Sequence, residues 1–495
     1  MNLLSPETLL ALLIGSLYGI TFGAIPGLTV TLALSLALPV LLFVGPEAAV
    51  AAVIGISAAA IFAGDIGSVI ARVPGTPASA AYAEEIHEIA RERSPGYALG
   101  IAALSSAIGS LIGLGFLVIG SFVLVWLAKQ FSSYEYFWLI LLGIVSGIFA
   151  VPSMLKGIVA FSIGMLLGTI GYDPALGYPR FTFGLPALLG GVDFIVALIA
   201  FFGVSEVFSR IYQGYHHQEQ RLQHFSRRQS LLRDFYIESI RLCWKARFSI
   251  LRSATIGTLV GFLPGAGSDL AAWITSNLKR LGQYTKKEDV VLASASSNNA
   301  AVAGAWIPAM ALGLPGDTLT AILLGLFLAL GITPGPDLFQ RYGHLVISVY
   351  MAFFLASVVI IPLGGYFAAA LASVVTRIPI QPLMGAILGL CILGAYAVNN
   401  NPFDLMVLSV LGLFGFLLRQ GGFPIGLLVL GMVLGPLLER NFMVSMIKTH
   451  WDLTSFFDRP VAIILALATL GLILGMLWVR YKMRARVEVG PAEEE

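Results

Sequence analysis

Polar residues that could bind a ligand are scarce in this sequence, and the most distinctive of them follow a proline-glycine break in an apolar stretch. Gly261 to Asp269 reads Gly-Phe-Leu-Pro-Gly-Ala-Gly-Ser-Asp and interrupts an otherwise apolar helix. Proline has no backbone N–H and, inside a helix, leaves backbone groups unpaired. At membrane depth such a backbone is tolerated only where it is buried in protein or lines a cavity. The break therefore predicts a cavity built by the rest of the chain.

The same break occurs earlier in the chain, and each copy is followed by another break. Gly19 to Thr29 repeats the Gly-x-x-x-Gly-x-x-Pro-Gly spacing of Gly257 to Gly265. The second breaks lie at Arg72 to Pro77 and at Leu314 to Asp317. Repeats with broken helices are the recurrent architecture of secondary transporters, which hold substrate and ions near the midplane of the membrane. We therefore expect two repeats, inverted relative to one another, with broken helices or re-entrant hairpins.

A polar patch, Ser294 to Ala300, lies between the two breaks of the second half. Side-chain amides and hydroxyls are costly in hydrocarbon unless they are paired or face water. An exposed loop is one interpretation, since Ser and Asn favour loops. We favour a buried site, because an apolar segment and another break follow at once. Asn298 and Asn299 would then offer donors and carbonyl acceptors to a substrate or Na⁺. Ser296 and Ser297 stand beside them.

Asp65 and Arg72 are the two ionisable residues of a long apolar run. They are seven positions apart, so a continuous helix would place both on one face. One interpretation is structural: Arg72 extends to the membrane interface and Asp65 caps or pairs locally. In the functional interpretation, Arg72 adds a positive charge to a carboxylate site, and Asp65 orients it or carries a coupling proton. Asp269 and Asp317 are further candidates for coupling.

Backbone N–H groups at the breaks are the remaining candidate ligands, at Gly75-Thr76, Gly265-Ala266-Gly267 and Gly316-Asp317. Half-helix N-termini carry partial positive charge and suit carboxylates, provided that these breaks do not simply end helices at the membrane surface. The expected substrate-binding residues are Arg72, Pro74, Gly75, Thr76, Gly265, Ala266, Gly267, Ser268, Asn298, Asn299, Gly316, Asp317 and Thr318. The expected ion-coupling residues are Asp65, Asp269, Asp317, Ser296 and Ser297.

Composition places the chain among polytopic membrane proteins of the all-α class. Of its 495 residues, 58% are hydrophobic and 11% are charged, against about 25% charged in soluble domains. At about 20 residues per crossing, we expect roughly 12 to 15 transmembrane segments or half-helices. Cys243 and Cys391 are isolated, so no disulfide, metal site or cofactor is indicated beyond a coupling ion. No Lys or Arg precedes Arg72, so we expect the first helix to be retained rather than cleaved as a signal peptide.

A basic segment divides the chain. Residues 210–252 hold nine Lys or Arg against three Asp or Glu, which predicts a cytoplasmic position for this segment. We interpret His216, His217 and His224 within it as solvated rather than metal-binding. The basic residues after the last apolar run predict a cytoplasmic C-terminus. The expected units are a first repeat (1–209), the basic segment (210–252), a second repeat with added C-terminal helices (253–480) and a tail (481–495). About seven crossings before the basic segment would place the N-terminus outside.

Six motifs follow one another along the chain. They are Gly19 to Thr29, Pro74 to Pro77, Gly171 to Pro174 with Arg180 to Gly184, Asn298 to Ala300 with Gly304 to Pro308, Leu312 to Gly316, and Pro334 to Pro336. In type, order and spacing they resemble the large membrane subunit of the tripartite tricarboxylate transporters, the TctA family. The resemblance covers nearly the whole chain.

The resemblance implies a multi-pass permease of the inner membrane for small organic anions such as di- and tricarboxylates. It implies coupling to a Na⁺ or H⁺ gradient by alternating access, in an elevator-like manner if the family resembles other carriers of this architecture. The implied partners are a small membrane subunit, an extracytoplasmic binding protein and the lipid bilayer, with no nucleic acid.

The sequence departs from the family pattern at four places. Arg72 replaces a usual Asn, Asp65 a usual Ser, and Ala295 the usual acidic residue before Asn-Asn, while Ala83 to His87 replaces an Asp-Gly-Tyr-Pro-like segment.

Two other classes of function are alternatives. A polytopic membrane enzyme would show a cluster of His, Cys or carboxylate residues within membrane segments. The six His lie near loops or segment ends, so no enzyme is expected. An uncoupled channel stays open as an alternative, because only transport against a gradient separates it from a coupled carrier.

Overall fold

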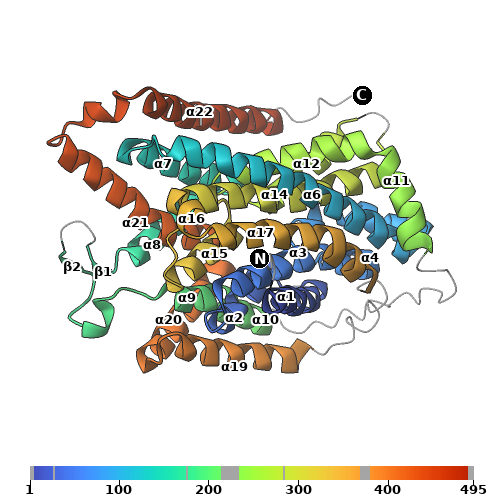
Figure 1. Cartoon of the computed structure of the whole chain (residues 1–495), viewed down its shortest axis with the longest axis horizontal. Helices are drawn as coiled ribbons and strands as arrows, with labels where there is room; N and C mark the ends of the chain where they lie inside the picture. The colour runs from blue at the N-terminus through green and yellow to red at the C-terminus, as the bar shows by residue number, and fades with distance from the viewer. Residues whose placement is uncertain are drawn as a thin grey trace.

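The chain is almost entirely helical in the computed structural model, which describes residues 5–25, 28–173, 177–212, 233–282, 285–367 and 380–488 (Figure 1). The first half contains α1 (Pro6–Ala24), α2 (Val30–Leu41), α3 (Pro46–Ala63), α4 (Asp65–Ala71), η1 (Ser79–Tyr82), α5 (Ala83–Glu92), α6 (Pro95–Ala128), α7 (Ser133–Ala150), α8 (Met154–Gly168), β1 (Gly171–Tyr172), β2 (Pro179–Arg180), η2 (Pro186–Leu188), α9 (Phe194–Leu198), η3 (Ile199–Val204) and α10 (Ser205–Tyr212). The second half contains η4 (Arg233–Glu238), α11 (Ser239–Lys245), α12 (Arg247–Phe262), α13 (Ser268–Arg280), α14 (Lys287–Leu312), α15 (Thr318–Ala329), α16 (Pro336–Arg341), α17 (Gly343–Leu355), η5 (Ala356–Ile360), α19 (Ile380–Asn399), α20 (Pro402–Gln420), α21 (Ile425–Lys448), η6 (Leu453–Phe457) and α22 (Pro460–Glu488).

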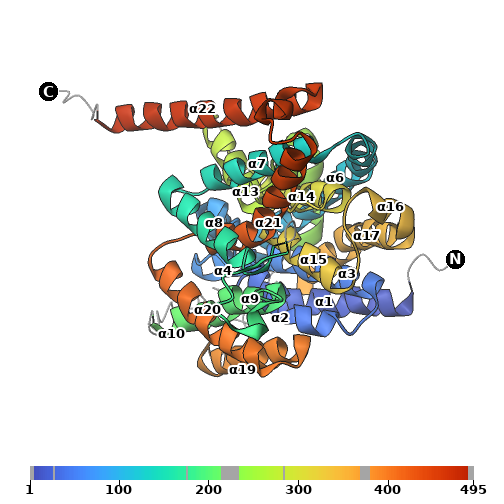
Figure 2. The same cartoon turned by 90° about the vertical axis from the view of Figure 1, so that its left-hand side faces the viewer.

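Ten helices in the described part of the chain are long and apolar enough to cross a membrane, and three shorter apolar helices accompany them. This confirms the all-α polytopic class. The helix that spans Pro46–Ile70 has its most apolar window fully buried, whereas the corresponding window of Pro460–Trp478 in α22 is 17% buried. Figures 1 and 2 both show α22 along one edge of the molecule and α19 along the opposite edge. The broken helices therefore form the centre, and exposed apolar helices surround them.

The first break belongs to a helical hairpin, a difference from the interrupted helix that the sequence predicts. Gly15, Gly19 and Gly23 of α1 pack against the backbone of Ala52, Ile56 and Ala60 of α3, respectively. Because both series ascend together, α1 and α3 run in the same direction. Only residues 42–45 join α2 to α3, so α2 must run back alongside them. The chain reverses its direction between the end of α1 and the start of α2, and Pro26 and Gly27 lie outside the described residues.

The second half repeats this arrangement. Gly257 and Gly261 of α12 pack against the backbone of Ser297 and Ala301 of α14, so these two helices also run parallel. The helix that connects them along the chain, α13, runs in the opposite direction. Glycine is required at these contacts because any Cβ would overlap the neighbouring backbone. The duplicated Gly-x-x-x-Gly spacing is thus the packing surface of each hairpin.

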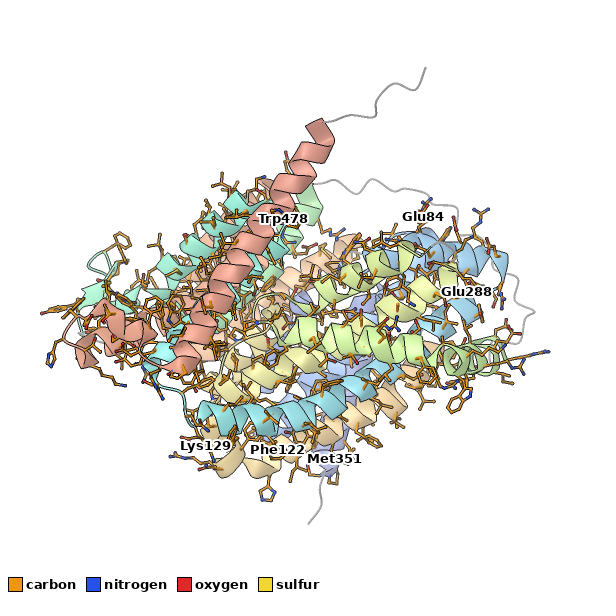
Figure 3. All side chains as sticks on the ribbon, turned by 90° about the horizontal axis from the view of Figure 1, so that it is seen from above. Glu84, Phe122, Lys129, Glu288, Met351 and Trp478 are labelled. Carbon is orange, nitrogen blue, oxygen red and sulfur yellow. The ribbon has the colours of Figure 1, made fainter. Side chains whose placement is uncertain are left out.

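The two halves are inverted, as the ion pairs of α5 show. Arg72, at the end of α4, pairs with Glu84, whereas Lys287, at the start of α14, pairs with Glu88 at 2.8 Å and with Glu92 at 2.6 Å. The end of α4, which follows α3, and the start of α14, the equivalent helix of the second half, therefore lie at the same end of the molecule. We call it the α5 end. Figure 3 shows Glu84 and Glu288 together at this end and Lys129, after α6, far from it.

The same ion pairs change the titration of the groups at the α5 end. The hydrogen bond from Lys287 lowers the pKa of the Glu88 carboxyl, so this carboxylate keeps its charge to a lower pH than an unpaired Glu does.

Two predicted segments differ in detail from the structure. The polar patch 294–300 lies in the middle of helix α14, where Ser294 to Asn299 are all buried, so the exposed-loop interpretation is wrong. The described part of the basic segment, 233–252, is helical rather than a loop. His216, His217 and His224 lie outside the described residues, as does the end of the C-terminal tail.

We predict that Gly261→Ala lowers the melting temperature of the purified protein, because its Cβ would overlap the carbonyl oxygen of Ala301. Overpacking of this kind costs about 1–3 kcal/mol. The matched control is Gly471→Ala in α22, where a Cβ meets nothing within 4 Å. Alanine there should leave stability unchanged or raise it by up to about 1 kcal/mol. Equal melting temperatures for the two variants would contradict the packing described here.

Candidate functional site

A cavity of about 140 Å³ lies where the starts of α2, η1, α13 and α15 meet, so both halves of the chain contribute to it. The predicted cavity is therefore present at the breaks. The residues that line it are Thr29, Val30, Thr31, Ile61, Thr76, Pro77, Gly267, Ser268, Asp269, Asn298, Asp317, Thr318 and Leu319.

Two helix starts of the second half face the cavity with different chemistry. α13 begins after Gly267, whose φ of 80° suits glycine and whose position supplies no side-chain cap. The first N–H groups of α13 therefore lack side-chain acceptors from this position. α15 is capped instead by Asp317, which accepts from the Thr320 N–H at 2.9 Å, while the Thr320 hydroxyl accepts from the Asp317 N–H at 2.9 Å. One start thus offers donors and the other a carboxylate.

The helix starts of the first half carry neutral hydroxyl groups at the same places. Thr29 caps α2 by accepting from the Leu32 N–H at 3.2 Å, and its hydroxyl lies 2.8 Å from that of Thr31. Thr76 and Ser79 form a reciprocal pair in which each hydroxyl accepts from the other's N–H at 3.1 Å. This pair repeats the arrangement of Asp317 and Thr320, with hydroxyls in place of the carboxylate.

Hydrogen bonds connect the breaks to one another. The Gly265 N–H donates to the Gly316 carbonyl at 2.8 Å, which joins the tip of the second hairpin to the break after α14. The Asp317 carboxylate also lies near the Ser268 N–H, and the Asp269 carboxylate lies near the Ala78 N–H of the first half. The breaks therefore satisfy much of their own backbone, which is how irregular chain survives in an apolar interior.

The charge of the cavity is acidic. Asp269 is exposed to solvent, whereas Asp317 is buried. Among the lining residues that the structure describes, these are the only ones that carry a formal charge. Carboxylates in such a place need a counter-charge or a proton. The cavity by itself thus favours cations in its second half.

The asparagines of the polar patch have separate roles. Asn298 lines the cavity, and its Oδ1 is buried without a hydrogen-bond partner among the described residues. Asn299 instead donates to the hydroxyl of Ser106 in α6. Ser297 lies 2.7 Å from the Thr275 hydroxyl, and Ser296 donates to the Ala293 carbonyl at 3.1 Å. These last three residues make their hydrogen bonds within the helix bundle and do not line the cavity.

Arg72 and Asp65 do not meet, contrary to the expectation that one face of a helix would hold both. Arg72 takes a left-handed backbone with φ of 56° and turns an exposed side chain to Glu84. Asp65 is buried and accepts a hydrogen bond from the Tyr82 hydroxyl at 2.8 Å. Neither residue is among those that line the cavity. The left-handed turn after Ala71 separates the two side chains, and the structural interpretation of Arg72 fits its position.

Several expected residues stand behind the cavity wall. Gly75 packs against the Gly23 carbonyl and Gly64, and Gly316 packs against the Gly261 carbonyl and Ala305. The remaining expected residues that are absent from the lining are Pro74, Gly265 and Ala266. The glycines at these positions allow close backbone approach in the breaks.

Sequence reasoning missed Thr29, Val30, Thr31, Ile61, Pro77 and Leu319 as lining residues. Thr29 and Thr31 could have been found by alignment of the two repeats, because they occupy the places of Gly267 and Asp269 after the Pro-Gly pair. Pro77 and Leu319 flank breaks that were recognised. Ile61 carried no signal, since one isoleucine in an apolar helix resembles any other.

Comparison with known proteins gives a matching family and two similar proteins. The profile of the family described as Tripartite tricarboxylate transporter TctA family matches residues 9–430. An Agrobacterium vitis protein named "Uncharacterized 52.8 kDa protein in TAR-I ttuC' 3'region" is 31% identical over 477 residues, which are 93% of this chain and 91% of that protein. A second, "Uncharacterized protein in TAR-II ttuC' 3'region" from the same organism, is 33% identical over 240 residues, 46% of this chain and 96% of that protein. No solved structure gives a significant match.

We predict that a cysteine at position 31 reacts with a small thiol reagent in the purified protein. Thr31 lines the cavity and is half-buried, so Thr31→Cys should be labelled within minutes. Ser35→Cys, one turn further along α2, is the control because Ser35 is fully buried and should stay unlabelled. The native Cys243 and Cys391 are buried, which keeps the background low. Labelling at both positions or at neither would argue against this cavity.

Proposed function

Because this chain belongs to the Tripartite tricarboxylate transporter TctA family and is a multi-pass membrane protein, we propose that it is the permease subunit that imports small organic anions across the cytoplasmic membrane. The observation that carries the proposal is the convergence of four helix starts from two inverted halves on one cavity. Helix N-termini carry partial positive charge, and the start of α13, which has no side-chain cap, presents N–H groups as well; both suit a carboxylate without a buried Arg or Lys.

The substrate side of the cavity is the first half. Thr29, Thr31 and Thr76 give it hydroxyl groups and no negative charge. Hydroxyls and N–H groups together can hold a carboxylate in a fixed orientation. Tricarboxylates are the substrate class that the family name supports, and the neutral hydroxyls of the cavity do not exclude dicarboxylates.

Import of an anion against a negative interior needs an energy source. Each negative charge costs about 2.3 kcal/mol per 100 mV when it moves inward. Entry of cations with the substrate offsets this cost, so uptake is coupled to Na⁺ or H⁺. Alternating access follows from the inverted hairpins, one approaching the cavity from each end of the molecule, and elevator-like motion is one form of it.

The α5 end is cytoplasmic in this proposal. Arg72, Arg93, Arg280 and Lys287 lie at that end, and Lys and Arg mark the inside of membrane proteins. Since α1 begins at the other end, the N-terminus is extracytoplasmic. A small membrane subunit and an extracytoplasmic binding protein complete the system, and the binding protein delivers substrate to the face opposite α5.

Uptake by proteoliposomes tests the proposal. The chain is reconstituted with its two partner subunits, and radiolabelled malonate, succinate and citrate are offered in turn under an inward Na⁺ or H⁺ gradient. A coupled carrier accumulates its substrate above the outside concentration and loses it when an ionophore collapses the gradient. Equilibration without accumulation would identify the alternative, an uncoupled channel, and no uptake of any carboxylate would remove the proposal. Conversion of a substrate without transport would indicate the other alternative, a membrane enzyme.

The two asparagines give a second prediction with different readouts. Asn298→Ala should lower uptake at least tenfold with little change in melting temperature, because its amide faces the cavity. Asn299→Ala should lower the melting temperature, since it leaves the Ser106 hydroxyl between α14 and α6 without its donor. A buried group left unpaired costs about 1–3 kcal/mol. Full uptake by a stable Asn298→Ala protein would remove that residue from the site.

A further inference from the structure

We propose that the two halves of the cavity bind opposite charges: Asp269, Asp317 and Asn298 hold a monovalent metal cation, Na⁺, that must bind before the carboxylate substrate enters beside Thr31 and Thr76. The inference rests on the proposed function and deepens it, since it assigns the coupling ion and its place. It starts from a comparison of the two inverted repeats, residue by residue.

The repeats differ in charge at the positions that meet in the cavity. The shared Gly-x-x-x-Gly-x-x-Pro-Gly register pairs Thr31 with Asp269, and the shared Pro-Gly of the second breaks pairs Thr76 with Asp317. All four residues line the cavity. The two repeats therefore present the same backbone arrangement to the cavity, but with neutral side chains in the first repeat and acidic side chains in the second.

The parallel packing of each hairpin pairs Ser57 with Asn298. Gly19 lies against Ile56 of α3, and the equivalent Gly257 lies against Ser297 of α14. Ile56 and Ser297 are therefore equivalent positions, and so are the residues that follow them, Ser57 and Asn298. The Ser57 hydroxyl donates to the Val53 carbonyl of its own helix at 2.8 Å and does not line the cavity. The Asn298 amide does line it, and its Oδ1 is a buried acceptor with no hydrogen-bond donor among the described residues. Buried acceptors in folded proteins are nearly always satisfied, so this oxygen is a ligand position that the protein itself leaves open.

Two carboxylates and a carbonyl oxygen form a hard-cation site. Oxygen ligands of this kind suit Na⁺ or another hard ion. The described lining residues include no His or Cys, so the side-chain ligands that they offer are oxygen atoms. A proton would need only one carboxylate, whereas a metal ion uses several oxygens at once. The single positive charge of Na⁺ leaves the pair of carboxylates partly neutralised.

Charge also sets the order of binding. An organic anion that enters the empty cavity would meet Asp269 and Asp317 with no lining Lys, Arg or His among the described residues. Like charges in one cavity repel, and the repulsion is strongest at the buried Asp317, where the dielectric constant is low. A bound cation removes much of this repulsion, after which the hydroxyls of Thr31 and Thr76 and the neighbouring N–H groups attract the carboxylate. Cation and anion therefore load in that sequence.

Thermal unfolding of the purified chain without substrate tests the cation site directly. Na⁺ added at constant ionic strength, with choline as the replacement, should raise the melting temperature, because a ligand that binds only the folded state stabilises it. Asp269→Asn and Asp317→Asn should each weaken the apparent Na⁺ affinity at least tenfold. The Asp317→Asn variant should fold, because Asn caps a helix as well as Asp does and the start of α15 keeps its cap. Asp337→Asn, at an exposed residue of α16, is the matched control and should respond as wild type does.

Binding of the carboxylate then tests the order. Titration with the carboxylate that the proteoliposomes accumulate should show binding at saturating Na⁺ and at least a tenfold loss of affinity in choline. A Na⁺ response that survives in both Asp variants would overturn the site, and so would stabilisation by protons but not by Na⁺. Equal carboxylate affinity with and without Na⁺ would overturn the order.

The outcomes separate this inference from the proposed function. Na⁺ stabilisation that both Asp variants lose, without uptake of any carboxylate in proteoliposomes, would support the cation site and refute the transport proposal. Coupled uptake that shows no Na⁺ stabilisation would support transport and refute this site.

Discussion

Backbone polar groups that lose their helical partners must find others, and in an apolar interior this requirement shapes the whole centre of the molecule. The breaks meet it in three ways: through caps such as Asp317 with Thr320, through bonds between breaks such as Gly265 to Gly316, and through close packing at glycine. Close packing depends on the parallel pairs α1 with α3 and α12 with α14, since only glycine lets these backbones touch. A side chain at Gly261 would move the break and the cavity with it.

Inverted duplication turns this local requirement into a site. Two hairpins and two broken helices approach from opposite ends, so four helix starts converge on one cavity. The frame is symmetric, whereas the side chains on it are not, because Thr31 and Thr76 share the cavity with Asp269 and Asp317. In the proposed mechanism, this combination of a symmetric backbone with asymmetric charge is what allows one cavity to bind ions of both signs.

The α5 end holds the halves together through charges at the surface. Arg280 of the second hairpin contacts Glu85 at 2.7 Å and the Ala81 carbonyl at 2.7 Å, and Trp273 donates to the Pro77 carbonyl at 3.2 Å. Exposed ion pairs contribute little each, about 0–1 kcal/mol. These contacts fix the position of α13 relative to the segment that carries Thr76, rather than adding much to stability. Arg72 belongs to this surface network, which explains its distance from the cavity.

The sequence by itself determined the class of protein, the duplication and the places of the breaks. Apolar content, the spacing of Gly19 and Gly23, and the Pro-Gly pairs are local signals, since proline and glycine act on the backbone wherever they stand. Polar residues beside such breaks are costly unless used, which is why six polar lining residues could be recognised, together with Gly267: Thr76, Ser268, Asp269, Asn298, Asp317 and Thr318. Only the tertiary structure decided which of the candidates share the cavity. Asn298 and Asn299 are neighbours, yet the helical rotation of α14 turns one to the cavity and the other to Ser106. The spacing of Asp65 and Arg72 predicted partners on one continuous helix. Instead, the left-handed backbone of Arg72 directs its side chain to Glu84, and Asp65 accepts a hydrogen bond from Tyr82. These contacts depend on how the chain packs after the helix ends, which no local sequence pattern encodes.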